Sequence, residues 1–370
     1  MAEIRIDRLH KAFGDFVAVV ESTFTIEDGE FFCMLGPSGC GKTTTLRIIA
    51  GLEHPTSGRI LLDGEDVTGL RAGERDIAFV FQMFALYPHM NVRANIGYPL
   101  RSQGAGRAET RQRVEETARL LRIEHLLDRR VSSLPGGDRQ RVALGRALVR
   151  RPRAFLMDEP LGTLDAEFRE LMREELRQLH DRVGATSVYV THDQIEALSM
   201  ADRIAVMRAG VMEQVGTPAE IYNRPRSMYV AGFVGSPAMN FLAARGPVAP
   251  GAETVAVDGA HVPLPSLGEG LDHDDGQLGV RPEHVYLDDA GPLRGSVFGV
   301  EYMGTRQILT VDTSAGRLRV RAPNDARVSI GETVGLTFRR DALILFDGRS
   351  GLALGQGPDG PGEAAGGVHV

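Results

Sequence analysis

Lysine and cysteine are both scarce in this chain of 370 residues. Lys11 and Lys42 are the only lysines among 42 basic residues, so arginine carries nearly all of the positive charge. Lys42 is therefore conspicuous. A lysine offers a compact, flexible ammonium, which at this position suits a phosphate better than the planar guanidinium of arginine. The two cysteines, Cys33 and Cys40, are too few for a disulfide framework and lack the spacing of zinc ligands.

Long apolar runs are also missing. The longest are strand-sized, whereas a helix that spans a bilayer needs roughly 20 apolar residues. Residues 1–14 contain no signal-peptide core, so we expect the protein to stay in the cytoplasm. Acidic residues outnumber basic ones by 49 to 42, which gives a net charge of −7. This balance disfavours nonspecific binding of nucleic acid, and we expect no nucleic-acid partner.

The first part of the chain has the texture of an α/β domain. Residues 1–235 alternate apolar, strand-like runs with amphipathic helical stretches, a pattern typical of a parallel sheet flanked by helices. Within this domain, residues 84–150 are expected to form a helical subdomain. Val114, Ala118 and Leu121 there fall on one face of a predicted helix.

The texture changes after Pro237. Glycine, proline and aspartate become frequent, and short alternating runs then follow. These features predict a small C-terminal all-β domain over residues 236–350. Residues 351–370 are rich in glycine and have little to bury, so we expect a disordered tail.

Residues 36–43 match the phosphate-binding P-loop pattern between an apolar run, Phe31–Leu35, and a helical run. Glycines there let backbone N–H groups turn toward a phosphate, and the helix N-terminus adds a favourable partial charge. We expect Lys42 to reach the β- and γ-phosphates of ATP and the Thr43 hydroxyl to bind Mg²⁺. The predicted nucleotide-binding residues here are Gly36, Pro37, Ser38, Gly39, Cys40, Gly41, Lys42, Thr43 and Thr44.

A second apolar strand, over residues 154–157, ends in two carboxylates, Asp158 and Glu159. A buried strand that delivers acids to a metal–phosphate site should have this pattern. We expect Asp158 to hold Mg²⁺ or its water and Glu159 to polarise the attacking water. Two solvated carboxylates would be a reasonable interpretation anywhere except beside a P-loop.

Further motifs follow the P-loop in a fixed order. They comprise Gln82, the signature residues Pro135, Gly136, Gly137 and Asp138, the turn residue Asp165, and His192. In residues and order the chain resembles the cassette of ABC transporters, which are P-loop NTPases. The resemblance implies that Gln82 contacts Mg²⁺ and couples to a membrane subunit, that His192 senses the γ-phosphate, and that Asp165 lies at the dimer contact. It also implies that Phe13 stacks on adenine, although Phe13 could equally be a core aromatic.

Three strings resemble one branch of that family, the ATPases of maltose-type sugar importers: residues 84–90, 231–242 and 279–284. This resemblance implies that the C-terminal domain is an OB-like β fold. It also implies a second ATPase subunit, two integral membrane permease subunits, an indirect periplasmic or lipid-anchored solute-binding protein, and a peripheral location on the cytoplasmic face of the inner membrane. We expect the surface beside Gln82, including Phe84, Leu86 and Tyr87, to receive a coupling helix from the permease.

The transported solute cannot be deduced from the chain, because other subunits select it. A sugar or polyol is the expectation. Glycerol phosphate, polyamines and phosphonates stay open.

The signature departs from the family pattern at two positions. The usual serine is replaced by Pro135, which offers neither a hydroxyl nor an N–H, and the usual glutamine is replaced by Asp138. We expect Asp138 to cap the following helix, whose N-terminus should also face a partner's γ-phosphate. Two interpretations stay open: a tolerated variant in a working homodimer, or pairing with a second, different ATPase that carries an ordinary signature.

Three other functions fit the sequence less well. An ABC protein acting on DNA or ribosomes would have a long coiled coil or two fused cassettes, and this chain has one P-loop and no sustained heptads. An exporter would not explain the importer-like strings after residue 230. A nucleotide-gated regulatory module stays possible because of Pro135 and Asp138, whereas Glu159 and His192 favour hydrolysis.

Overall fold

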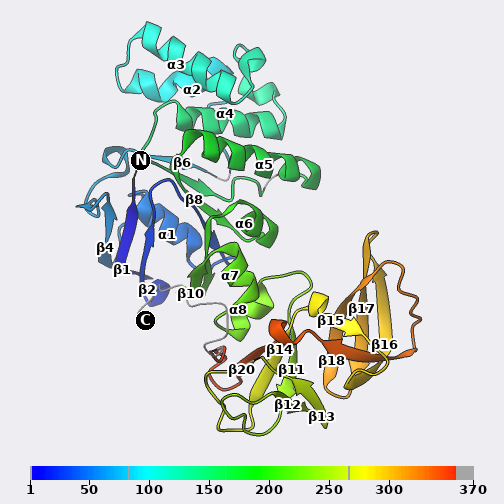
Figure 1. Cartoon of the computed structure of the whole chain (residues 1–370). Helices are drawn as coiled ribbons and strands as arrows, with labels where there is room; N and C mark the ends of the chain where they lie inside the picture. The colour runs from blue at the N-terminus through cyan, green and yellow to red at the C-terminus, as the bar shows by residue number, and fades with distance from the viewer. Residues whose placement is uncertain (1, 82, 163, 266, 356–370) are drawn as a thin grey trace. The chain divides into compact units, whose positions relative to one another are not determined.

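The computed structural model describes residues 2–81, 83–162, 164–265 and 267–355, which form two compact units (Figure 1). The first unit ends at Pro218, and the second begins at Ala219. Over these described ranges, no helix is both long enough and apolar enough to cross a membrane.

A six-stranded sheet forms the centre of the first unit. In spatial order its strands are β10 (Val211–Gly216), β9 (Arg203–Arg208), β3 (Phe31–Leu35), β8 (Thr186–Thr191), β7 (Ala154–Asp158) and β6 (Ile77–Val80). All neighbours run parallel except β10, which is antiparallel to β9. β3 and β8 are buried along their whole length, as expected for strands covered on both faces. The carboxyl ends of β3, β7 and β8 therefore meet at one edge of the sheet.

An antiparallel sheet packs beside the central one. Ile4 and Ile6 are buried and Arg5 between them is exposed, the alternation of a strand with one face on a core. That core also contains Met34 of β3 and Leu46 of α1. The elements are β2 (Phe16–Ile26), β1 (Ile4–Phe13), β4 (Ser57–Leu62), β5 (Glu65–Asp66) and α1 (Lys42–Ile49).

Three α-helices occupy the stretch in which the helical subdomain is expected, and Figure 1 shows them grouped at one end of the first unit. They are α2 (Val92–Ser102), α3 (Arg107–Leu120) and α4 (Gly136–Leu148). Gly145 of α4 allows a close approach, because a Cβ there would lie 3.0 Å from Leu121 and 3.2 Å from Ile96. The unit is completed by α5 (Ala166–Val183) and α6 (Gln194–Met200).

The second unit is mainly antiparallel β structure. Its largest sheet has five strands, in the order β15 (Val285–Leu287), β19 (Thr333–Phe338), β16 (Leu293–Tyr302), β17 (Arg306–Thr313) and β18 (Gly316–Pro323). A smaller sheet joins β11 (Asn240–Ala244), β14 (Gly276–Val280) and β20 (Ile344–Asp347), and a hairpin is formed by β12 (Thr254–Val257) and β13 (Ala260–Pro263).

The boundary between the units differs from the expected residue 235. The short helices α7 (Pro218–Asn223) and α8 (Met228–Phe233) group with the β unit. The reason is Arg281, which is 2% exposed and donates hydrogen bonds to the carbonyl oxygens of Tyr222, in α7, and of Val234, just after α8.

The end of the chain also differs in part from the expected tail over 351–370. Leu352 bridges Ser227, and Ala353 bridges Phe346 of β20. Residues 351–355 are therefore part of the β unit. The rest of the expected tail, residues 356–370, lies outside the described residues.

Candidate nucleotide site

The loop after β3 depends on two glycines. A Cβ on Gly36 would overlap the carbonyl oxygen of Met207, and a Cβ on Gly41 would overlap that of Ala18. Gly41 also has a φ of 105°, which L-residues rarely adopt. The loop can therefore follow this path only with glycine at both ends. Its exposed tip consists of Pro37, Ser38 and Gly39.

Lys42 opens α1, and its side chain is folded into the loop. Its Nζ donates hydrogen bonds to the carbonyl oxygens of Gly36 at 2.7 Å and Pro37 at 2.9 Å, and lies 3.8 Å from Sγ of Cys40. The residue is only 4% exposed. Carbonyl dipoles balance a buried ammonium less well than an anion does. When a nucleotide binds, its phosphate oxygens can therefore replace the carbonyl oxygens of Gly36 and Pro37 as partners of the Lys42 ammonium.

Thr43 follows at an exposed position and is joined to the end of β7. Its Oγ1 donates a hydrogen bond of 3.0 Å to Oδ1 of Asp158. Burial raises the pKa of Asp158, and the neighbouring Glu159 raises it further, while the Thr43 hydrogen bond opposes both effects. A hydroxyl and a half-buried carboxylate are oxygen donors of the kind that Mg²⁺ prefers. These two residues therefore fit a magnesium ion.

Glu159 stands where β7 ends, in a strained backbone conformation with φ of 43°. Its N–H donates a hydrogen bond to the carbonyl oxygen of Val190 on the adjacent β8 at 3.0 Å. Its Oε2 lies 3.2 Å from Nδ1 of His192. The two side chains are 20% and 57% exposed, respectively, so water can reach the pair. Positive φ at a non-glycine residue is found preferentially at functional sites.

Phe13, at the end of β1, is 48% exposed, so it is not a core aromatic. Lys11 Nζ lies 4.5 Å from the centre of its ring and also pairs with Glu53 at 2.8 Å. A ring presented to solvent at this position has a free face on which a base could stack. Stacking on adenine stays a prediction.

The signature residues lie at the start of α4, in the helical subdomain rather than beside the P-loop. The helix begins at Gly136, with Pro135 at the N-cap position and no side-chain cap. The expectation that Asp138 caps the helix is wrong, because the helix begins two residues earlier than Asp138 and places it in the first turn. Its carboxylate instead lies 3.4 Å from Nη1 of Arg141.

The turn that precedes α5 is held by Asp165. Its Oδ1 accepts a hydrogen bond of 3.0 Å from the N–H of Phe168, which caps the N-terminus of α5. Phe168 also approaches the signature helix, because a Cβ on Gly137 would lie 3.4 Å from its ring. The turn and the signature helix are thus neighbours within one chain.

The surface beside Gln82, which we expect to receive a coupling helix from the permease, is only partly exposed among the described residues. Gln82 lies outside the described residues. Phe84 is buried, so it cannot face a partner as expected, whereas Leu86 and Tyr87 are half-buried. Arg146 of α4 explains the difference, because its guanidinium donates hydrogen bonds to the carbonyl oxygens of Phe84 at 2.8 Å and Ala85 at 2.6 Å. The sequence reasoning missed Arg146, since nothing local connects it to this loop.

Comparison with known proteins agrees with this architecture. An ABC transporter family model matches residues 19–162, and a TOBE domain model matches residues 278–346. The sn-glycerol-3-phosphate import ATP-binding protein UgpC of Ruegeria pomeroyi is 45% identical over 358 residues, which cover 96% of this chain and 100% of that protein. The chain belongs to the ATP-binding subunits of ABC importers.

Two further similarities extend over different parts of this importer ATPase. The trehalose import ATP-binding protein SugC of Mycobacterium tuberculosis is 43% identical over 396 residues, covering 96% of this chain and 98% of that protein. The dimeric structure of MJ0796, a bacterial ABC transporter cassette, has a TM-score of 0.52 and 33% identity, covering 58% of this chain and 98% of that one.

Membership of the family confirms several predictions. The chain is an ATPase of the α/β P-loop cassette fold with a C-terminal OB-like domain, and it binds ATP. As an import ATP-binding subunit without a membrane-spanning helix in its described residues, it is a peripheral, membrane-associated protein.

Proposed function

We propose that two copies of this importer ATPase close head to tail around two Mg-ATP molecules, at the cytoplasmic face of the inner membrane, and thereby drive uptake of a sugar or polyol. One observation carries the proposal. Lys42, the Thr43–Asp158 pair and the Glu159–His192 pair all stand at or just beyond the carboxyl ends of β3, β7 and β8. Ligands of open parallel sheets bind at this edge.

Each copy supplies the phosphate-binding side of a site. The Lys42 ammonium leaves the carbonyl oxygens of Gly36 and Pro37 and binds the β- and γ-phosphates. Thr43 and Asp158, with Gln82 as the family resemblance implies, are the residues that would hold Mg²⁺. The ion supplies charge neutralisation at the phosphates when bound.

Glu159 is the general base in this proposal. Its carboxylate accepts a proton from the water that attacks the γ-phosphate, and its position at the end of β7 limits its motion. His192 orients the carboxylate through the 3.2 Å contact between its Nδ1 and Oε2 of Glu159. Phe13 stacks on the adenine.

The opposite copy supplies the signature helix. The first helical hydrogen bond of α4 runs from the N–H of Arg139 to the carbonyl oxygen of Pro135 at 3.0 Å. The N–H groups of Gly136, Gly137 and Asp138 therefore have no acceptor within the helix, and the helix N-terminus favours an anion. We propose that these amides contact the γ-phosphate bound by the partner copy.

The relatives support a hydroxylated solute. Their names specify import of sn-glycerol 3-phosphate and of trehalose, which both carry free hydroxyl groups. A sugar, a polyol or a phosphorylated polyol is therefore the proposed solute class, recognised by a permease and a solute-binding protein.

The test uses vesicles that contain this chain together with the permease subunits encoded beside its gene, and the corresponding solute-binding protein. We expect ATP-dependent uptake of labelled trehalose, sn-glycerol 3-phosphate or a related polyol, lost in Lys42→Ala, and two copies of this chain per complex by mass. Uptake of a polyamine or a phosphonate alone would contradict the solute class. Uptake that occurs only after a second, different ATPase is added would contradict the homodimer.

A further inference from the structure

The variant signature places the carboxylate of Asp138 at a position where the site must attract another anion, the γ-phosphate of ATP. Asp138 is the third residue of α4, and its side chain is 25% exposed. In the proposed dimer this turn faces the partner's γ-phosphate, so an uncompensated carboxylate would repel the nucleotide. A working site therefore requires something that neutralises Asp138 or holds it aside.

Pro135 removes the usual partner of such a carboxylate. An acidic side chain at the third position of a helix often accepts a hydrogen bond from the N–H of the N-cap residue. Proline has no N–H, so Asp138 cannot make this contact. The two departures from the family pattern are thus linked: the residue at position 135 leaves the carboxylate at position 138 free to pair elsewhere.

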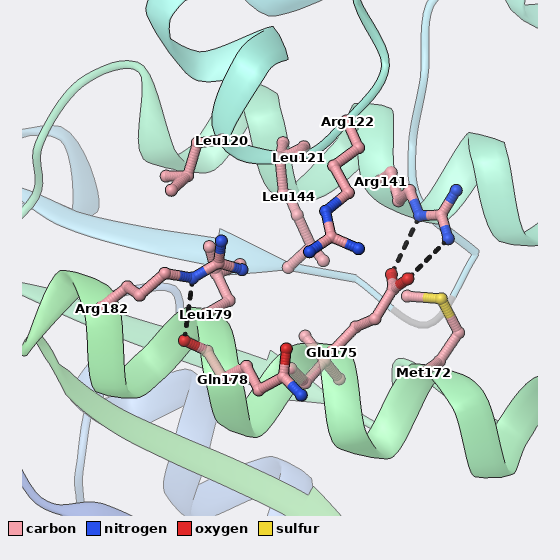
Figure 2. Close-up of a pocket in the computed structure, with 11 residues that line it drawn as sticks. Leu120, Leu121, Arg122, Arg141, Leu144, Met172, Glu175, Gln178, Leu179 and Arg182 are labelled. Atoms are coloured by element: carbon pink, nitrogen blue, oxygen red, sulfur yellow. Dashed lines mark hydrogen bonds and ion pairs between the residues drawn. The ribbon is translucent and has the colours of Figure 1, made fainter.

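Arg141 provides that pairing. Its Nη1 lies 3.4 Å from Oδ1 of Asp138, one helical turn away. The same guanidinium donates two hydrogen bonds to Glu175 of α5, at 3.0 and 2.8 Å, and Figure 2 shows its fork facing that carboxylate. The bidentate contact fixes the guanidinium in place. The Arg141 side chain is 21% exposed, so its charge is only partly screened.

We propose that Arg141 is a positioning residue that draws the Asp138 carboxylate away from the signature amides and so keeps the variant signature able to bind ATP. This inference rests on the proposed head-to-tail dimer. Arg141 itself touches no nucleotide in this scheme and acts through Asp138. Glu175 contributes only by anchoring the guanidinium to α5.

The test measures ATP-driven dimerisation of the full chain in a Glu159→Gln background, which prevents hydrolysis. Adding Arg141→Gln should raise the ATP concentration for half-maximal dimerisation about tenfold. Adding Asp138→Gln to that variant should restore the parent value, because no carboxylate is then left to hold. ATP binding to the monomer should not change in either variant, since each copy's own loop is untouched.

Arg139→Gln is the matched control, because it removes the same charge from an exposed position of the same helix, two residues before Arg141. No ion pair of Arg139 is found among the residues described, so its effect should be much smaller. An equal loss with Arg139→Gln, no loss with Arg141→Gln, or a loss that Asp138→Gln fails to rescue would each overturn the inference. Failure of the Glu159→Gln parent to dimerise with ATP would instead contradict the proposed function, on which the inference rests.

Discussion

The imidazole Nδ1 of His192 lies 3.2 Å from Oε2 of Glu159, across the ends of two adjacent parallel strands. Glu159 belongs to the turn after β7 and is tied to β8 by the hydrogen bond from its N–H to Val190. His192 directly follows β8. The sheet thus fixes both backbones, and the side-chain contact fixes the direction of the carboxylate.

Replacing His192 with Ala should lower the rate of ATP hydrolysis about a hundredfold, the lower end of what a positioned acid–base pair contributes. The KM for ATP should change little, because the phosphates are held by the loop. His192→Gln should recover part of the rate, since its amide can still donate to Glu159. Steady-state phosphate release checks this, and a large rise in KM with an unchanged kcat would contradict the assigned role.

Replacing Lys42 with Ala should weaken ATP binding at least about a hundredfold, the effect of losing a charged hydrogen-bond donor worth about 3 kcal/mol. Lys42→Arg should not restore binding, because a planar guanidinium cannot replace a compact ammonium in this buried place. Lys11→Ala, at the other lysine, is the control and should have a far smaller effect. Isothermal titration with ATP distinguishes these outcomes, and tight binding by Lys42→Ala would refute the pocket.

Glu196 of α6 should make stability depend on pH. It is 3% exposed, accepts hydrogen bonds from Tyr189 at 2.9 Å and Thr191 at 2.7 Å, and burial raises its pKa above 4.5. The folded state therefore holds the proton more tightly than the unfolded state, so this residue's contribution is fully present below pH 4.5 and is lost as pH rises through the raised pKa.

Glu196→Gln should consequently raise the midpoint of thermal unfolding by a few degrees at pH 7.5, and the gain should shrink as the pH approaches 4. Its amide oxygen can still accept both hydroxyl hydrogen bonds. Glu196→Leu should destabilise at both pH values, since two buried hydroxyls lose their acceptor. A gain that grows toward acid pH would contradict the account.

Arg281 should be essential to the β unit. It is 2% exposed and lies with its guanidinium 3.9 Å from the ring centre of Tyr222. Arg281→Leu should destabilise the unit by about 3 kcal/mol, because buried carbonyl groups lose their donors. Hydrogen exchange should increase in α7, α8 and β14, while ATP binding persists. The exposed Arg339→Leu is the control and should change stability by no more than about 0.5 kcal/mol.

The phosphate-binding half of the site could be predicted from the sequence because each part is local. A glycine loop follows one buried strand, and Asp158 and Glu159 end another. Parallel strands bring such ends to one edge, where the structure joins Thr43 to Asp158 and Glu159 to His192. Spacing along the chain was sufficient to propose Lys42, Thr43, Asp158 and Glu159, whereas His192 was proposed from the resemblance to the ABC cassette, and its contact with Glu159 was not predicted.

The surroundings of α4 could not be predicted, because they depend on residues far along the chain. Glu175, which anchors Arg141, is 34 residues away, and Arg146 holds the backbone of Phe84 from 62 residues away. The unit boundary was missed for the same reason, since Arg281 binds Tyr222 across 59 residues. Only the contact between Arg141 and Asp138 could have been expected from the local sequence, because Arg141 stands one helical turn after Asp138.

The central claim is that Glu159 activates water at a site whose phosphates are held by other groups. Measuring ATP affinity and phosphate release side by side for the wild type and Glu159→Gln tests it most directly. We expect equal affinity, at least a hundredfold slower release, as for a lost general base, and a lasting ATP-bound dimer. Loss of ATP binding, or release at the wild-type rate, would contradict the account.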